Sequence, residues 1–125
     1  MKRVISTDKA PAAIGPYSQA ILVNGTLYAS GQLGIIPETG EFAEGVTAQT
    51  EQAFRNIRAI LEAAGLNLSH VIKTTCFLAD MGDFAAMNEV YSRQFDGAFP
   101  ARSAVAVRTL PKNGLVEIEV IAIAD

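Results

Sequence analysis

The chain has 125 residues and a mass of 13.3 kDa, a size typical of one compact domain. Half of its residues are apolar and 18% are charged, a composition that excludes a disordered or collagen-like chain. Ten basic and thirteen acidic residues give a net charge of −3, which disfavours nucleic acid and acidic membranes as partners because general polyanion binders carry a basic excess. We therefore expect a single domain over residues 1–125.

The first part of the chain has the pattern of a sheet. A short strand is predicted at residues 2–6, and longer strands at 18–23 and 26–31 flank Asn24-Gly25. The Asn-Gly dipeptide readily adopts the two positive φ angles of a type I′ turn, so these strands should form a hairpin. A further strand is expected at residues 32–36, before a segment rich in turn-forming residues.

The periodicity then changes to that of helices. Apolar residues recur at helical spacing over residues 47–64 and 83–95, which predicts two amphipathic helices. Between them, residues 71–79 are apolar on both faces, as in a central strand. The last two predicted strands, residues 102–108 and 115–124, are joined by a loop with turn chemistry, and we expect them to pair as a hairpin.

Together these elements predict an α+β fold, with a mixed sheet of about six strands and two helices on one face. The last strand carries apolar side chains on both faces, whereas two helices can shield only one. The same surface of a second copy is the simplest cover for the other face, so we expect a homo-oligomer. The alternative is a curled sheet that closes on itself.

Cys76 and His70 are the only cysteine and the only histidine. An internal disulfide and a Cys/His zinc site within one chain are therefore excluded, and triad chemistry would have to use His70. We expect Cys76 to be buried and His70 to lie at the surface. The first residues lack the apolar core of a signal peptide, and the uncharged residues 10–37 are interrupted by proline and glycine, so we expect a cytoplasmic protein without a membrane span.

Arg102 is the clearest candidate for chemistry. It opens a strand whose neighbours on the same face, Ala104 and Ala106, are small and leave room for a ligand. A guanidinium can hold a carboxylate through two parallel hydrogen bonds. The alternative is a solvent-exposed arginine at a strand edge, or one in a structural ion pair.

Glu117 and Glu119 interrupt one face of the apolar last strand. Without a partner, such a carboxyl group has a raised pKa, which suits a general base; a structural salt bridge, for instance to Arg108, is the alternative. In the predicted hairpin Arg102 lies near Ile123 and Glu117 lies near Arg108, which puts Arg102 roughly 20 Å from Glu117 at about 3.3 Å per residue. A site that uses both groups therefore needs strong sheet curvature or two subunits.

Tyr17, which follows Gly15-Pro16, and Ser30-Gly31, at the end of the hairpin, could shape a pocket. A core tyrosine and a strand-end serine are the more ordinary interpretations of these residues. The sequence contains no G-x-S-x-G segment, P-loop or G-x-G-x-x-G segment.

Several segments carry a family resemblance. They are Ala-Pro-Ala-Ala-Ile-Gly-Pro-Tyr-Ser-Gln at residues 10–19, Ser-Gly-Gln at 30–32, Asn-Glu-Val-Tyr at 88–91, Phe-Pro-Ala-Arg-Ser at 99–103 and Glu-Ile-Glu at 117–119. Over essentially the whole chain, this set resembles the RidA/YjgF family of reactive intermediate deaminases. The Pro-Ala-Arg-Ser segment with the later Glu-Ile-Glu strand is the most specific part of the resemblance.

The resemblance implies a chorismate-mutase-like fold, a homotrimer with clefts between subunits, and hydrolysis of enamine and imine intermediates. In this family 2-iminobutanoate, 2-iminopropanoate and 2-aminoacrylate are converted to 2-oxo acids and ammonia without a metal or organic cofactor. By position, Arg102 would hold the substrate carboxylate and Glu117 would orient or activate the attacking water. The residues expected to line the cleft are Tyr17, Ser30, Gly31 and Asn88. Ala104 stands where many members have cysteine, which argues against a mechanism that needs a thiol there and bears on pocket size and substrate range.

Two other functions stay open at this point. Some relatives have been described as endoribonucleases or translation inhibitors, a function weakened here by the acidic balance and the lack of a basic stretch. A non-catalytic module that binds small carboxylates would keep Arg102 but would not need Glu117.

Overall fold

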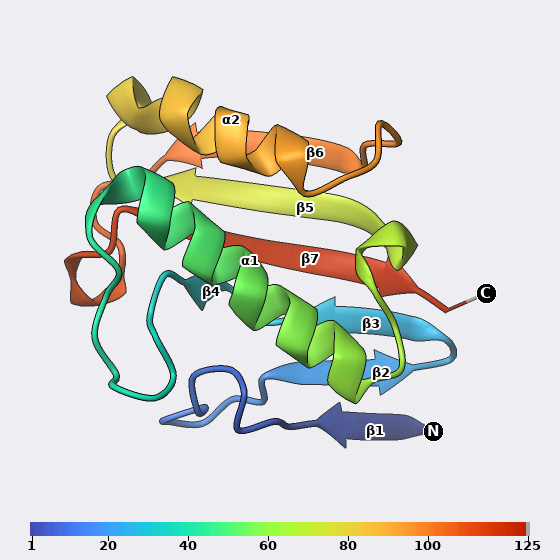
Figure 1. Ribbon diagram of the computed structural model, residues 1–125. Helices are drawn as coiled ribbons and strands as arrows, with labels where there is room; N and C mark the ends of the chain where they lie inside the picture. Colours follow the sequence, from blue (N-terminus) through green and yellow to red (C-terminus); the bar gives the residue numbers. More distant parts are fainter. Residues whose placement is uncertain (125) are drawn as a thin grey trace.

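The computed structural model describes residues 1–124. They form a mixed β-sheet with both α-helices packed on one face (Figure 1). The strands are β1 (Lys2–Ile5), β2 (Ala20–Val23), β3 (Thr26–Ala29), β4 (Gln32–Leu33), β5 (Val71–Leu78), β6 (Ala101–Ala106) and β7 (Val116–Ile123), and the helices are α1 (Gly45–Ala63) and α2 (Phe84–Arg93). The sheet order is β1-β2-β3-β7-β5-β6, and β4 pairs with β7 beyond the end of β3. The α+β class is confirmed, with seven strands where about six were expected, and the strand predicted at 32–36 is only two residues long.

The β2–β3 hairpin forms as its turn residues predict. Asn24 and Gly25 have φ angles of 50° and 78°, and Val23 pairs with Thr26 across the turn. Two positive φ angles in a row match the right-handed twist of the flanking strands. On its other side β3 pairs with β7, which carries Glu117.

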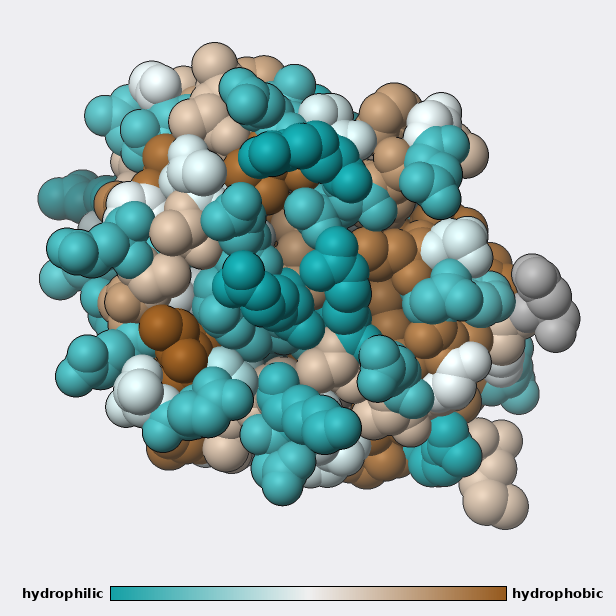
Figure 2. Space-filling view, in the orientation of Figure 1, coloured by the Kyte–Doolittle hydropathy of each residue, from teal (hydrophilic) through white to brown (hydrophobic). Residues whose placement is uncertain are grey.

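The core lies between α1 and the central strands. The apolar stripe of α1, with Phe54, Ile57, Ile60 and Leu61 all fully buried, packs on the buried face of β7. Hydrophilic side chains predominate along the outward side of α1 (Figure 2). Helix α1 therefore shields one face of the sheet and leaves the other face uncovered.

Strands β6 and β7 do not form the predicted hairpin, because β5 lies between them. Strand β6 runs parallel to β5 and β7 runs antiparallel to it, so Arg102 pairs with Thr74 and Glu117 pairs with Phe77. The expected positions of Arg102 near Ile123 and of Glu117 near Arg108 are therefore wrong.

The segment between β6 and β7 explains the difference. At its two ends, the amide of Val107 donates to Leu78 O, and the amide of Ala79 donates to Leu115 O, so both ends are tied to the last residue of β5 and the residue that follows it. The turn-forming residues in the middle make the 3₁₀ helix η3 (Pro111–Asn113) within a loop that passes around the end of β5. Turn chemistry at this point thus marks a crossover and not a tight hairpin.

The sheet face opposite the helices carries a row of apolar side chains. Along β7, residues 116, 118, 120 and 122 are buried toward the helices, and the alternate residues face the other way. On that second face Val4, Tyr28, Val105 and Ile123 have exposed fractions between 41% and 57%. The prediction of an apolar second face is confirmed, and the sheet stays open because its edge strands, β1 and β6, do not pair with each other.

Within residues 1–124, neither helix combines the length and the apolarity that crossing a bilayer requires.

Candidate functional site

Arg102 is held between strand β6 and helix α2. Its Nη1 atom donates a hydrogen bond of 2.6 Å to Oδ1 of Asn88, and its Cζ atom lies 4.6 Å from the ring centroid of Tyr91 and 5.4 Å from that of Phe84. These three residues are four and three positions apart on α2, so they share one face of the helix. Both ordinary alternatives are therefore wrong, since Arg102 is half-buried and its contacts are an amide and two aromatic rings.

The guanidinium lines a cavity of about 410 Å³ together with Asn88, Tyr91, Ser92, Phe99 and Pro100. Among the described residues, Asn88 is the only one that accepts a hydrogen bond from the guanidinium of Arg102. Because a guanidinium carries five N–H donors, most of them stay available to a ligand in this cavity. Ala104, the next residue of β6 on the same face, is partly buried and packs against the core.

Glu117 lies on β7, on the face that the helices do not cover. Burial raises the pKa of its half-buried carboxyl group above the ordinary value of 4.5, and the neighbouring charge of Glu119 raises it further. The described residues contain no ion pair between Glu117 and Arg108, so the predicted raised pKa is the interpretation that the structure supports.

Gly31 leaves room for the Glu117 side chain. A Cβ atom at Gly31 would lie 2.8 Å from Oε2 of Glu117 and 2.9 Å from its Cδ, well inside van der Waals contact. With any larger residue at position 31, the Glu117 side chain would have to shift from its present place. The Ser-Gly-Gln segment therefore marks a packing constraint around Glu117.

A second cavity, of about 560 Å³, brings together four residues that the sequence analysis singled out. Its lining includes Tyr17, Ser30, Gly31 and Glu117. Ser30 Oγ donates 2.6 Å to Ser18 O, which fixes that hydroxyl, whereas Tyr17 is exposed. The sequence analysis missed Lys112, which also lines this cavity and adopts a φ of 56° in the turn before β7.

The two cavities lie on opposite faces of the sheet. On β5, Thr74 opposite Arg102 is buried toward the helices, while Phe77 opposite Glu117 is three residues further along and so faces the other side. The structure groups Arg102 with Asn88, and Glu117 with Tyr17, Ser30 and Gly31, but one protomer does not bring the two groups together. Curvature within one sheet therefore does not join them.

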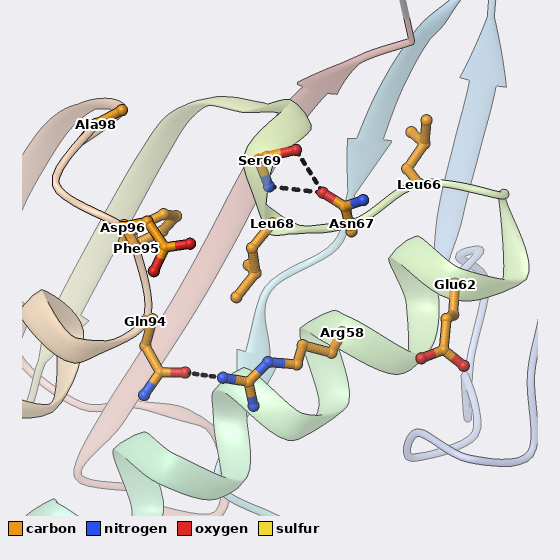
Figure 3. Close-up of a pocket in the computed structure, with 10 residues that line it drawn as sticks. All are labelled: Arg58, Glu62, Leu66, Asn67, Leu68, Ser69, Gln94, Phe95, Asp96 and Ala98. Atoms are coloured by element: carbon orange, nitrogen blue, oxygen red, sulfur yellow. Dashed lines mark hydrogen bonds between the residues drawn. The ribbon is translucent and has the colours of Figure 1, made fainter.

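A third hollow, of about 360 Å³, contains none of the predicted site residues. It lies between the end of α1, the 3₁₀ helix η1 (Leu68–His70) and the segment after α2, where Arg58 donates a hydrogen bond to Gln94 (Figure 3). Nearby, Nδ1 of the half-buried His70 accepts a hydrogen bond from the amide of Asn67, so this histidine closes a helix cap. The hollow has a mixed apolar and polar lining, and its arginine is already hydrogen-bonded to an amide.

Cys76 is fully buried, as predicted. Burial raises the pKa of its thiol to about 11, so the group stays protonated at neutral pH and is a packing residue. Residues 1–124 contain no cluster of three His, Cys, Asp or Glu side chains that could hold a metal ion.

Comparison with known proteins gives consistent relatives over nearly the whole chain. The family model described as Endoribonuclease L-PSP matches residues 7–124. A 2-iminobutanoate/2-iminopropanoate deaminase from Capra hircus is 54% identical over 124 residues, which cover 98% of this chain and 90% of the relative.

Two solved structures show the same fold. RidA from the Antarctic bacterium Psychrobacter sp. PAMC 21119 has a TM-score of 0.94 and 55% identity, covering 97% of this chain and 98% of that one. E. coli TdcF, solved with bound serine, has a TM-score of 0.95 and 42% identity, covering 98% and 99% of the two chains.

The raised pKa of Glu117 can be measured directly. We predict that its carboxyl group titrates above 4.5 in NMR spectra of the protein with ¹³C-labelled glutamate. The substitution Glu119→Gln should lower this midpoint, because it removes the neighbouring charge, but should leave it above 4.5, because burial is the larger cause. A midpoint that does not move in Glu119→Gln would contradict this assignment of causes.

Proposed function

The chain belongs to the Endoribonuclease L-PSP family, and on that premise we propose that it is a 2-iminobutanoate/2-iminopropanoate deaminase of the RidA type. It hydrolyses small imines and their enamine tautomers, such as 2-aminoacrylate, to 2-oxo acids and ammonia. The observation that carries the proposal is the guanidinium of Arg102, oriented by α2 and still rich in free donors, at the wall of a cavity.

In this proposal Arg102 binds the substrate carboxylate. A guanidinium offers two parallel N–H groups to the two carboxylate oxygens, which fixes both the position and the orientation of a small anion. With one nitrogen bonded to Asn88, the remaining donors of the guanidinium are free to bind this carboxylate. The bound serine in E. coli TdcF supports a small amino-acid-like ligand for this fold.

Glu117 acts on the attacking water. In its ionised form it accepts a proton from water as the water oxygen bonds to the carbon of the protonated imine, which gives a neutral carbinolamine. Glu117 returns this proton to the nitrogen and then takes up the hydroxyl proton of the carbinolamine. The C=O bond forms as the C–N bond breaks, and ammonia leaves. A well-placed general base contributes roughly a hundredfold to ten-thousandfold, which is adequate for a reaction that also proceeds in water.

The site is completed between protomers of a homotrimer. Arg102 lies on the edge strand β6, and Glu117 lies on the uncovered sheet face, so the Arg102 cavity of one protomer can meet the Glu117 cavity of the next. A two-fold dimer or a closed ring can bring two different patches together, and the family resemblance implies a ring of three. Such a ring also covers the apolar row on the second sheet face.

The activity is tested by generating 2-aminoacrylate in place with a PLP-dependent serine or threonine dehydratase and following its decay. We predict faster decay with the protein, no acceleration with Arg102→Ala, and an acceleration reduced about a hundredfold or more with Glu117→Ala. Matched changes of the same residue types outside both cavities, Arg93→Ala and Glu62→Ala, should leave the rate unchanged.

Other outcomes would overturn the proposal. Unchanged decay with tight binding of 2-oxo acids would identify a carboxylate-binding module. Cleavage of RNA that survives nuclease-free purification and disappears in Arg102→Ala would identify a nuclease.

The assembly has its own test. At micromolar concentration, light scattering coupled to size exclusion should give about three times the chain mass of 13.3 kDa. The substitution Ile123→Lys places a charge on the uncovered sheet face and should shift the protein toward monomers and lower its activity. A wild-type monomer at this concentration would contradict the proposed site.

A further inference from the structure

We propose that Tyr91 and Thr74 are positioning residues that fix the orientation of the Arg102 guanidinium, and that their buried hydroxyl pair serves ligand affinity more than stability. This inference rests on the proposed function, in which Arg102 holds the substrate carboxylate. It assigns a role to two uncharged residues that act on the ligand through Arg102.

The ring of Tyr91 is the surface on which the guanidinium rests. The Cζ atom of Arg102 is closer to the centroid of Tyr91, at 4.6 Å, than to that of Phe84, at 5.4 Å. Stacking over an aromatic face leaves the N–H groups free in the plane of the guanidinium, where a carboxylate binds. The tilt of the Tyr91 ring therefore sets the plane in which the ligand is received.

That tilt is fixed from two directions. On one side the ring packs against Phe54 and Phe95, with centroid distances of 5.7 and 5.2 Å. At its other end the Tyr91 hydroxyl forms a buried hydrogen bond of 2.7 Å with Oγ1 of Thr74. Burial raises the pKa of Tyr91, so the phenol keeps its proton and the hydrogen bond persists at neutral pH.

Thr74 connects this ring to the strand pair that carries Arg102. It lies directly opposite Arg102 in the parallel register of β5 and β6, and it is fully buried. Its hydroxyl thus ties the ring to a fixed point of the sheet beside the backbone of Arg102. The guanidinium is bounded by the ring below it and by the amide of Asn88 at Nη1.

Stability alone does not explain a hydroxyl pair at this place. The neighbouring inward residues of β5, Cys76 and Leu78, are fully buried and fill the core without a hydroxyl. Replacing both partners of a buried hydrogen bond by apolar groups of the same shape is nearly neutral for stability, whereas removing one partner leaves the other unsatisfied. A Val and Phe pair would therefore fill the same space but would lack the directional bond that holds the ring.

This difference separates a positioning role from a structural one. The double variant Thr74→Val with Tyr91→Phe keeps the shape of the core and the aromatic face, so its thermal stability should stay close to that of the wild type. Its affinity for 2-oxobutanoate, measured by calorimetry, should fall about 5- to 20-fold, and the KM for 2-aminoacrylate should rise by a similar factor, with kcat changed less than about twofold.

Thr74→Ser should behave in the opposite way. It keeps the hydroxyl and loses a buried methyl group, so its melting temperature should fall while its affinity for 2-oxobutanoate stays within about twofold of wild type. Thr50→Val is the matched control: Thr50 is also fully buried, but its hydroxyl donates to Val46 O within α1 and has no link to Arg102. It should leave affinity unchanged.

The substitution Arg102→Ala distinguishes a failure of the proposed function from a failure of the positioning role. If Arg102→Ala does not weaken 2-oxobutanoate binding, the proposed role of Arg102 fails, and this inference fails with it. If Arg102→Ala abolishes binding but the double variant binds like wild type, the positioning role alone is overturned. The same holds if Thr74→Ser loses as much affinity as the double variant.

Discussion

Strand β5 separates the arginine and the carboxylate on which the proposed chemistry depends. It pairs with β6 through Thr74 and Arg102 and with β7 through Phe77 and Glu117, and these two pairs are three residues apart. Because side chains alternate along a strand, an odd separation sends the two groups to opposite faces. The two side chains line separate cavities of one protomer, so the proposed shared site uses two copies of the chain.

Each half of the site is shaped by its own local packing. On the helix side, the four- and three-residue spacing of Phe84, Asn88 and Tyr91 places an amide and two rings around one guanidinium. Cation–π contacts of this kind contribute about 0.5 to 2 kcal/mol each. On the other side, Gly31 leaves room for the Glu117 carboxylate, and partial burial makes it easier to protonate. The first half can bind an anion, and the carboxylate of the second half can accept a proton.

Local signals in the sequence predicted much of the fold. Asn24-Gly25 predicted its hairpin, and helical periodicity predicted both helices to within a few residues. The pairing of β6 was wrong because turn residues at Pro111–Asn113 report only local backbone geometry. They do not show which strand lies between the two segments that they connect. The position of β5 between β6 and β7 depends on non-local packing.

The candidate site, like the fold, was predictable only where local sequence segments indicate it. Arg102, Asn88 and Glu117 stand in specific segments, and the structure places each at a cavity. Tyr91 stands in the same segment as Asn88, but its contact with the guanidinium and its hydrogen bond to Thr74 appear only after α2 is placed over β5 and β6. The spacing of residues 84, 88 and 91 on a predicted helix was the one available signal.

The shared site is tested most directly by mixing two inactive chains, Arg102→Ala and Glu117→Ala, in equal amounts under conditions that let subunits exchange. In mixed trimers, some junctions combine an intact Arg102 from one chain with an intact Glu117 from the other. The account predicts recovery of about one quarter of the wild-type rate, the fraction of such junctions in a random mixture. A mixture that forms mixed trimers yet stays as inactive as its two parents would contradict a site built across the subunit boundary.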